Sequence, residues 1–260
     1  MCYDMLEQKY IAHKTENGLA IACPQTPLWI WLAQGTTTAD ARLFFDGFLR
    51  QNPPPLTGIV AEKKFAIPCA EMYTQTKRRE QHNTAAAFSQ KELISYFLPP
   101  GVSLPSDAPL HGELRPPSPT EMPTILAWIN AFYSETLQTS PPQKLKFEGE
   151  GGSGGEGTFQ SSLSPRELNI IRLFVLHTTR AVAMGLLTGT GETCRINLVY
   201  VPPEFRGRGY GRVLVGALAK KIREDGQMPV LYTDVGNAAA NGLYTALGFR
   251  AAGRLLEVGF

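Results

Sequence analysis

The sequence contains little of what would mark a metalloprotein, a nucleic-acid-binding protein or a membrane protein. Its four cysteines form no C-x-x-C pair and have no histidine at ligand spacing, so neither a zinc site nor a disulfide framework is predicted. A net charge of +2 gives no broad basic surface for nucleic acid. The most apolar stretch, LWIWLA at 28–33, is far too short to span a bilayer, and the N-terminus lacks the charged and then apolar pattern of a signal peptide.

The residue composition is typical of a globular protein. Hydrophobic residues make up 43% of its 260 residues and charged residues 18%, which is typical of a soluble protein with a substantial core. That length allows one large domain or two modest ones. Scattered thiols fit a reducing compartment, so we expect a cytoplasmic location.

The first part of the chain alternates strand-like and helix-like stretches, which predicts an α/β arrangement. The expected elements are strands at 28–33 and 56–61 and helices at 37–51 and 62–80. The second of these helices is expected to be interrupted near Pro68. Turn residues without periodicity fill 98–112, so we predict an N-terminal α/β domain at 1–110 and a second domain at 111–260.

The second part of the chain has a more regular pattern, with a strand and a helix followed by a glycine-rich tract and then a strand-rich region. The expected elements are strands at 113–118, 172–177, 181–189, 191–201, 228–235 and 250–260 and helices at 120–137, 164–168, 209–225 and 237–249. The runs at 172–177 and 181–189 are expected to form an antiparallel hairpin. The tract at 148–157 is predicted to be a flexible linker, because its G-x-S-x-G match has no strand before it and no helix after it. Together these patterns predict a mixed sheet with helices.

A turn rich in glycine and arginine lies between the strand at 191–201 and the next helix. Gly207, Gly209 and Gly211 would let the free N–H groups of a helix start approach a ligand closely. Arg206 and Arg208 add charged donors, so a phosphate or pyrophosphate is the expected ligand. Neither a P-loop nor a dinucleotide fingerprint is matched. Taken alone, the segment is explained equally well by a tight turn with solvated arginines.

The segment after this helix supplies a second motif. The R/Q-x-x-G-x-G/A motif is matched by Arg206, Gly209 and Gly211. The N-x-x-A-x-x-L-Y-x-x-L-G-F motif is matched by Asn237, Ala240, Leu243, Tyr244, Leu247, Gly248 and Phe249. With both motifs in this order, the chain resembles the GNAT superfamily of acyl-CoA N-acyltransferases over 164–260, and the stretch from 113 resembles the family's first strand and helix. Residues 1–110 are not explained by the motifs, although the layout resembles two-part bacterial members, which leaves a GNAT-like or a substrate-side role open for them.

The resemblance implies acetyl-CoA as cosubstrate and no metal. Its pyrophosphate would lie on the glycine-rich turn, and its pantetheine arm would pair with the backbone of the strand before it. The cofactor-binding positions implied in this way are Val199, Val201, Arg206, Gly207, Arg208, Gly209, Tyr210, Gly211 and Asn237. Tyr244 matches the position of the family's usual general acid, which protonates the departing thiolate.

The resemblance therefore implies an N-acetyltransferase that uses acetyl-CoA and a primary amine of a small molecule or peptide. Asn197 stands near the place where some relatives carry a basic glutamate, and an amide cannot accept a proton at neutral pH. A base acting through water, such as Glu204 or Asp234, or no dedicated base, stays open. The alternative function is a non-catalytic acyl-CoA-binding or sensing module, and an ATP-binding protein would lack the expected lysine and magnesium ligands. The sequence indicates no nucleic-acid or membrane partner, and it specifies neither the acceptor nor the oligomeric state.

Overall fold

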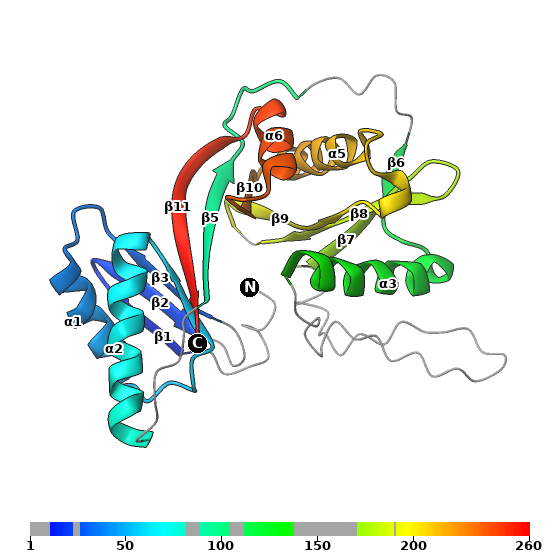
Figure 1. Cartoon of the computed structure of the whole chain (residues 1–260). Coiled ribbons are helices and arrows are strands. Elements are labelled where there is room, and N and C mark those ends of the chain that lie inside the picture. The colour runs from blue at the N-terminus through cyan, green and yellow to red at the C-terminus, as the bar shows by residue number, and fades with distance from the viewer. Residues whose placement is uncertain (1–10, 23–26, 82–88, 105–111, 138–170, 190) are drawn as a thin grey trace. The chain divides into compact units, whose positions relative to one another are not determined.

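The computed structural model describes residues 11–22, 27–81, 89–104, 112–137, 171–189 and 191–260. The chain forms two compact units, and each is built from separated stretches of sequence (Figure 1). The first unit takes in Met1–Ser95, Tyr232–Ala238 and Ala251–Phe260, and the second takes in Tyr96–Leu231 and Ala239–Arg250. The predicted domain boundary near residue 110 stays a prediction. Among the described residues, no helix is both long and apolar enough to cross a membrane.

The first unit has a sheet with the strand order β1-β2-β3-β4-β11-β5. Its strands are β1 (Ile11–Thr15), β2 (Gly18–Ala22), β3 (Leu28–Leu32), β4 (Gly58–Ala61), β5 (Ser89–Phe97) and β11 (Arg250–Gly259). Two helices, α1 (Thr38–Leu49) and α2 (Lys63–Gln81), pack on one face of this sheet, and Phe45, Phe65 and Ile59 belong to the buried core between them. The predicted strands at 28–33 and 56–61 are confirmed, whereas β1, β2 and β5 were not predicted.

Helix α1 begins where its capping residue predicts. The Thr37 hydroxyl accepts a hydrogen bond from the backbone N–H of Asp40, and the Asp40 carboxylate accepts one from the backbone N–H of Thr37. This reciprocal pair satisfies two N–H groups that a helix start leaves free. The same contact with Thr37 lowers the pKa of Asp40.

The predicted interruption of α2 near Pro68 is wrong, because α2 continues through that residue to Gln81. Proline removes one hydrogen bond from the helix. The face that carries Phe65, Cys69 and Tyr73 is buried in the core of the first unit, and burial of that apolar surface outweighs the loss.

The second unit has the strand order β5-β10-β9-β8-β7-β6, so that strands β5, β10 and β11 contribute residues to both units. Its other strands are β6 (Glu113–Arg115), β7 (Ile171–His177), β8 (Ala181–Thr188), β9 (Thr193–Tyr200) and β10 (Met228–Asp234). Its helices are α3 (Met122–Phe132), which continues as the π-helical turn η2 (Tyr133–Leu137), α5 (Tyr210–Glu224) and α6 (Ala238–Ala246). The single turns η1 (Pro119–Glu121) and η4 (Pro203–Phe205) are 3-10 helices.

Helices pack on both faces of the sheet of the second unit. Ile125 and Ile129 of α3 share a core cluster with Met184 of β8 on one face. The adjacent Gly185 faces α5, where a Cβ atom would lie only 2.6 Å from a methyl group of Leu218. This alternation along one strand separates the two helical layers.

Most elements predicted for the second part are confirmed. The hairpin of β7 and β8 is antiparallel, and β9 and β10 pair in parallel as a strand–helix–strand unit around α5. The structure therefore confirms a mixed sheet with α/β connections. The linker predicted at 148–157 and the short helix predicted at 164–168 lie outside the described residues.

Candidate functional site

The turn between β9 and α5 requires glycine at two positions. Gly207 has a φ of +73° and Gly209, which caps α5, has a φ of +82°. This left-handed region is unfavourable for residues with a side chain. A Cβ atom on Gly207 would meet no other atom within 4 Å, so the turn faces open space there.

The backbone amides of 207–211 are available to a ligand. The first hydrogen bonds of α5 run from Arg212 and Val213 to the carbonyl oxygen of Gly209. Within the part of the chain that the structure describes, no residue accepts a hydrogen bond from the amides that precede them, at 207–211. A helix start with free N–H groups and a favourable dipole is a binding site for an anion.

The two arginines of the turn have different environments. Arg206 donates from Nε to the carbonyl oxygen of Val201 at 2.9 Å and from Nη2 to Oε2 of Glu135 at 2.6 Å. Glu135 also accepts a hydrogen bond from the Tyr200 hydroxyl at 2.9 Å. Arg208 is exposed, and no described carboxylate pairs with it. Arg206 therefore fixes the entry to the turn, while Arg208 is the cation that is free to meet an anion.

Glu135 and Tyr200 were not identified from the sequence. Glu135 precedes Arg206 by 71 residues, and no local pattern joins them. The hydrogen bond from Arg206 lowers the pKa of Glu135, so this carboxylate stays charged at neutral pH and is a poor proton acceptor. Burial and the contact with Glu135 raise the pKa of Tyr200.

Gly211 has a packing role in addition to its place in the turn. A Cβ atom there would lie 3.2 Å from Cδ1 of Leu243 on α6 and 3.7 Å from Cγ2 of Val201. The absence of a side chain lets the first turn of α5 lie close to α6 and to the end of β9.

Strand β9 leaves its parallel neighbour after a short pairing. The pairs with β10 are Thr193 with Met228, Cys194 with Pro229 and Arg195 with Val230. Beyond them β9 carries a bulge opposite β8, in which Leu198 has a φ of +47°. A bulge bends the strand that contains it, and in these two fully described strands the paired residues of β9 and β10 end at Arg195 and Val230. Val199 and Val201 lie in or just after this stretch.

Tyr244 is a buried residue of α6 with an available hydroxyl group. The residue is 8% exposed, and its ring lies 6.0 Å from the rings of Tyr96 and Phe249. Tyr96 donates a hydrogen bond to Oδ1 of Asn241 at 2.9 Å, whereas the Tyr244 hydroxyl bonds to no residue that the structure describes. Burial raises the pKa of Tyr244 to about 12, so this phenol is protonated at neutral pH and can donate a proton.

The other predicted polar residues have defined positions. Asn197 donates from its side chain to the Thr188 hydroxyl at 2.6 Å, which gives this amide a structural partner. In the first unit, Asn237 lies one residue before α6, and its backbone N–H donates to the carbonyl oxygen of Asp234. Asp234 pairs with Lys91 at 3.5 Å, and Glu204 is exposed on η4. Among the residues described, no group of three or more His, Cys, Asp or Glu side chains could hold a metal ion.

A separate ion-pair network joins β6 to η1 in the second unit. Glu121 accepts hydrogen bonds from two nitrogens of Arg115 at 2.8 and 3.0 Å and from the backbone and hydroxyl of Ser118, each at 2.8 Å. His177 lies 3.7 Å away on β7. The hydrogen bonds from Arg115 are the largest cause that lowers the pKa of Glu121 to about 2.

The substitution Glu121→Gln is expected to destabilise the protein by about 1–3 kcal/mol at pH 7, because it weakens charge-assisted hydrogen bonds in a mostly buried network. The folded-state pKa of about 2 lies below the ordinary value of 4.5, so this stabilisation is present above pH 4.5 and is lost as the pH falls toward 2. Urea unfolding of both proteins from pH 7 down to pH 3 measures the difference. Glu113→Gln removes an exposed charge near the same arginine and is the control. Equal losses in the two variants would contradict this role for Glu121.

Comparisons with known proteins agree with this geometry. Residues 174–256 match the family model described as FR47-like protein, which is GNAT-related. A GNAT-family acetyltransferase from Colwellia psychrerythraea superimposes with a TM-score of 0.54 at 15% identity, covering 97% of this chain and 85% of that one. For a GCN5-related N-acetyltransferase from Kribbella flavida the TM-score is 0.56 at 11% identity, with 97% and 89% covered. A conserved protein of unknown function from Staphylococcus epidermidis gives a TM-score of 0.56 at 15% identity, with 97% and 93% covered.

The three structures share the fold of this chain across nearly its whole length, including the N-terminal stretch that the two sequence motifs did not reach. No curated protein matches the chain. The FR47-like match contains β9, the glycine-rich turn, α5 and α6, which are the elements that build the candidate site. Residues 174–256 therefore match a GNAT-related family model, and the chain shares the fold of GNAT-family acetyltransferases.

Proposed function

We propose that this protein is an N-acetyltransferase that transfers the acetyl group of acetyl-CoA to a primary amine of a small molecule or peptide. The observation that carries the proposal is the row of free amides at 207–211 at the start of α5, beside the exposed Arg208. These groups suit the pyrophosphate of acetyl-CoA, because they supply several donors and a positive dipole at one point. An acyltransferase of this kind also fits the GNAT-related family model that residues 174–256 match.

The pairing of β9 with β10 ends before Val199, which leaves room for the pantetheine arm beside β9. This arm carries two amide groups, and unpaired strand groups of β9 at Val199 and Val201 could bond to them as to an added strand. The carbonyl oxygen of Val201 already accepts from Arg206, so its N–H is the group that remains for a ligand. In this proposal the amides of Gly207, Tyr210 and Gly211 hold phosphate oxygens. The cofactor contact of Asn237 stays a prediction of the sequence motif.

Tyr244 would act as the general acid. Direct attack of an amine on a thioester requires that both reactants be positioned and that the departing thiolate be protonated. A phenol with a pKa of about 12 carries its proton at neutral pH, so it can donate a hydrogen bond to the departing sulfur. Full transfer of the proton to a thiolate, whose ordinary pKa is about 8.5, requires the pKa of that thiol to be raised in the site as well. Its ring is held between Tyr96 and Phe249, which limits its orientations.

The second candidate is a module that binds or senses acyl-CoA without catalysis. One observation favours it: Asn197, which stands near the position of a basic glutamate in some relatives, cannot accept a proton and is bonded to Thr188. If the protein is an enzyme, turnover depends on a base acting through water, for which Glu204 and Asp234 are the carboxylates to consider, or on no dedicated base.

We also propose a cytoplasmic location, in keeping with the unpaired thiols of Cys69 and Cys194.

Calorimetric titration of the purified protein with acetyl-CoA tests the proposal, with ATP and NADH as controls. We expect saturable binding of acetyl-CoA and none of the controls, because only acetyl-CoA combines a pyrophosphate with an arm that can pair with β9. Release of free CoA thiol in the presence of candidate amines then separates the enzyme from the binding module. Absence of acetyl-CoA binding would reject both candidates.

A further inference from the structure

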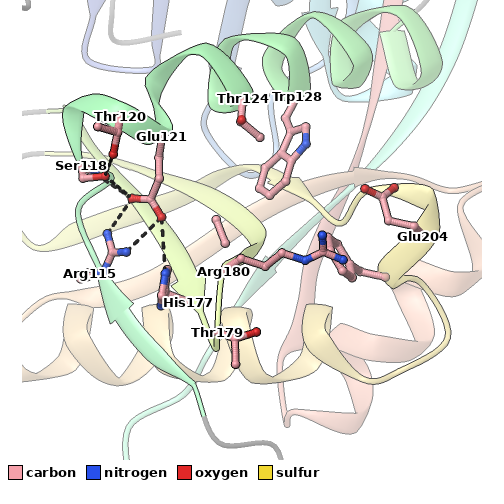
Figure 2. Close-up of a pocket in the computed structure, with 12 residues that line it drawn as sticks. Arg115, Ser118, Thr120, Glu121, Thr124, Trp128, His177, Thr179, Arg180 and Glu204 are labelled. Carbon is pink, nitrogen blue, oxygen red and sulfur yellow. Dashed lines mark hydrogen bonds and ion pairs between the residues drawn. The ribbon is translucent and has the colours of Figure 1, made fainter.

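The second unit contains a pocket that none of the proposed cofactor contacts lines. It has a volume of about 500 Å³ and lies between η1 and α3, the turn that joins β7 to β8, and η4 (Figure 2). The strand order places β8 and β7 on one side of β9 and β10 on the other. The pocket is lined from the β8 side, whereas the proposed pantetheine arm pairs on the β10 side. It is therefore separate from the proposed cofactor channel.

At one end of this pocket the polar side chains bond to one another. Figure 2 shows Arg115, Ser118 and His177 converging on the carboxylate of Glu121. Because this carboxylate already has several donors, the charges at this end are balanced. This end therefore has no unpaired charge to attract a ligand.

The other end carries charges without protein partners. Arg180 lies with its guanidinium carbon 4.8 Å from the ring centroid of Phe205, a buried residue of η4. Among the described residues, no carboxylate lies within 4.0 Å of Arg180, and no cation lies within that distance of Glu204. Both side chains line the pocket, and so does the Trp128 ring (Figure 2).

Stacking on Phe205 prepares Arg180 for a ligand. The contact holds the planar guanidinium by its face and leaves its N–H groups at the edge free to donate. Phe205 is itself fixed, since its ring meets the Tyr210 ring at 6.2 Å in an edge-to-face contact. A planar carboxylate can accept two parallel hydrogen bonds from a guanidinium held in this way.

We propose that this pocket binds a small zwitterion of the amino-acid type, with its carboxylate on Arg180, its ammonium group on Glu204 and its apolar part against Trp128. A ligand with only a negative charge would leave Glu204 unpaired and be repelled by it, and a ligand with only a positive charge would meet the same difficulty at Arg180. A ligand that carries both charges satisfies both residues. The pocket's volume is within the usual range for small-molecule sites.

Three matched compounds test this proposal: L-phenylalanine, 3-phenylpropionate, which lacks the ammonium group, and phenethylamine, which lacks the carboxylate. Ligand-detected NMR titration of the full chain measures each affinity. We expect phenylalanine to bind with a dissociation constant on the order of millimolar, as suits so small a ligand, and the other two to bind at least about tenfold more weakly.

Substitutions in the pocket test which residues bind phenylalanine. Arg180→Gln and Glu204→Gln should each weaken phenylalanine binding by about tenfold or more. Lys220→Gln and Glu224→Gln remove the same charges from exposed positions of α5 outside the pocket and should leave the affinity unchanged. Gly209→Trp, which alters the glycine-rich turn, should also keep phenylalanine binding, so this test is independent of the proposed acetyl-CoA site.

Several results would overturn the proposal. Failure of phenylalanine to bind would do so, as would equal affinity for 3-phenylpropionate, since the ammonium group would then have no role. Equal binding by Arg180→Gln and Lys220→Gln would remove Arg180 from the site. Loss of phenylalanine binding in Gly209→Trp would place the ligand at the glycine-rich turn instead.

Discussion

Gly209→Trp is expected to abolish acetyl-CoA binding, with no saturable heat in a titration that gives a full curve for the unaltered protein. Gly209 caps α5 in the left-handed region, with a φ of +82°. An indole ring attached there would occupy the space beside the amides of 207–211, where the pyrophosphate is proposed to bind. The loss should exceed about 100-fold in affinity, because several charge-assisted hydrogen bonds are prevented together.

Gly209→Ala is the matched control for backbone strain. Any residue with a Cβ atom is unfavourable at this φ, by roughly 1–2 kcal/mol, so alanine and tryptophan share that cost. Alanine adds only one methyl group and should keep measurable acetyl-CoA binding. If tryptophan at 209 left the affinity unchanged in a folded protein, the assignment of the phosphate site to this turn would be refuted. If alanine removed binding as completely as tryptophan, the backbone conformation and not the filled space would be responsible.

Tyr244→Phe is expected to lower turnover by about 100-fold while acetyl-CoA affinity stays near normal, since a positioned proton donor contributes on that order to a rate. The hydroxyl bonds to no described residue, so its removal leaves no described group unpaired and the ring contacts with Tyr96 and Phe249 persist. The measurement is the rate of CoA thiol release at saturating acetyl-CoA, together with a calorimetric dissociation constant. Full activity in this variant would exclude Tyr244 as the general acid.

The neighbouring tyrosine supplies the control for that substitution. Tyr96→Phe also removes one hydroxyl from the same ring pair, but this hydroxyl is already bonded to Asn241. The Tyr96→Phe substitution should cost about 1 kcal/mol of stability and leave turnover close to normal.

The pH dependence of the activity gives a further prediction. Because the pKa of Tyr244 is raised to about 12, activity should not fall through loss of its proton between pH 7 and pH 10. A decline in that range that disappears in Tyr244→Phe would contradict this.

Local signals in the sequence were sufficient for much of the second unit. The glycine-rich turn, the start of α5 and the hairpin of β7 and β8 follow from neighbouring residues, because φ preferences, capping and apolar periodicity act over a few positions. The motif that contains Tyr244 likewise lies within a single helix and its ends. Local reasoning failed at Pro68, where burial of one helix face in the core outweighs a proline inside the helix.

The sequence by itself predicted where the proposed anion-binding turn lies, which glycines can adopt its positive φ values and which tyrosine is proposed as the proton donor. Only the tertiary structure decided that Arg206 is engaged by Glu135 while Arg208 is free, that β9 leaves β10 after Arg195, and that β11 pairs with β4 in the first unit. Contacts of this kind join residues far apart in the chain. They depend on strand register and on the space left by packing, and no pattern within a short window of sequence encodes either.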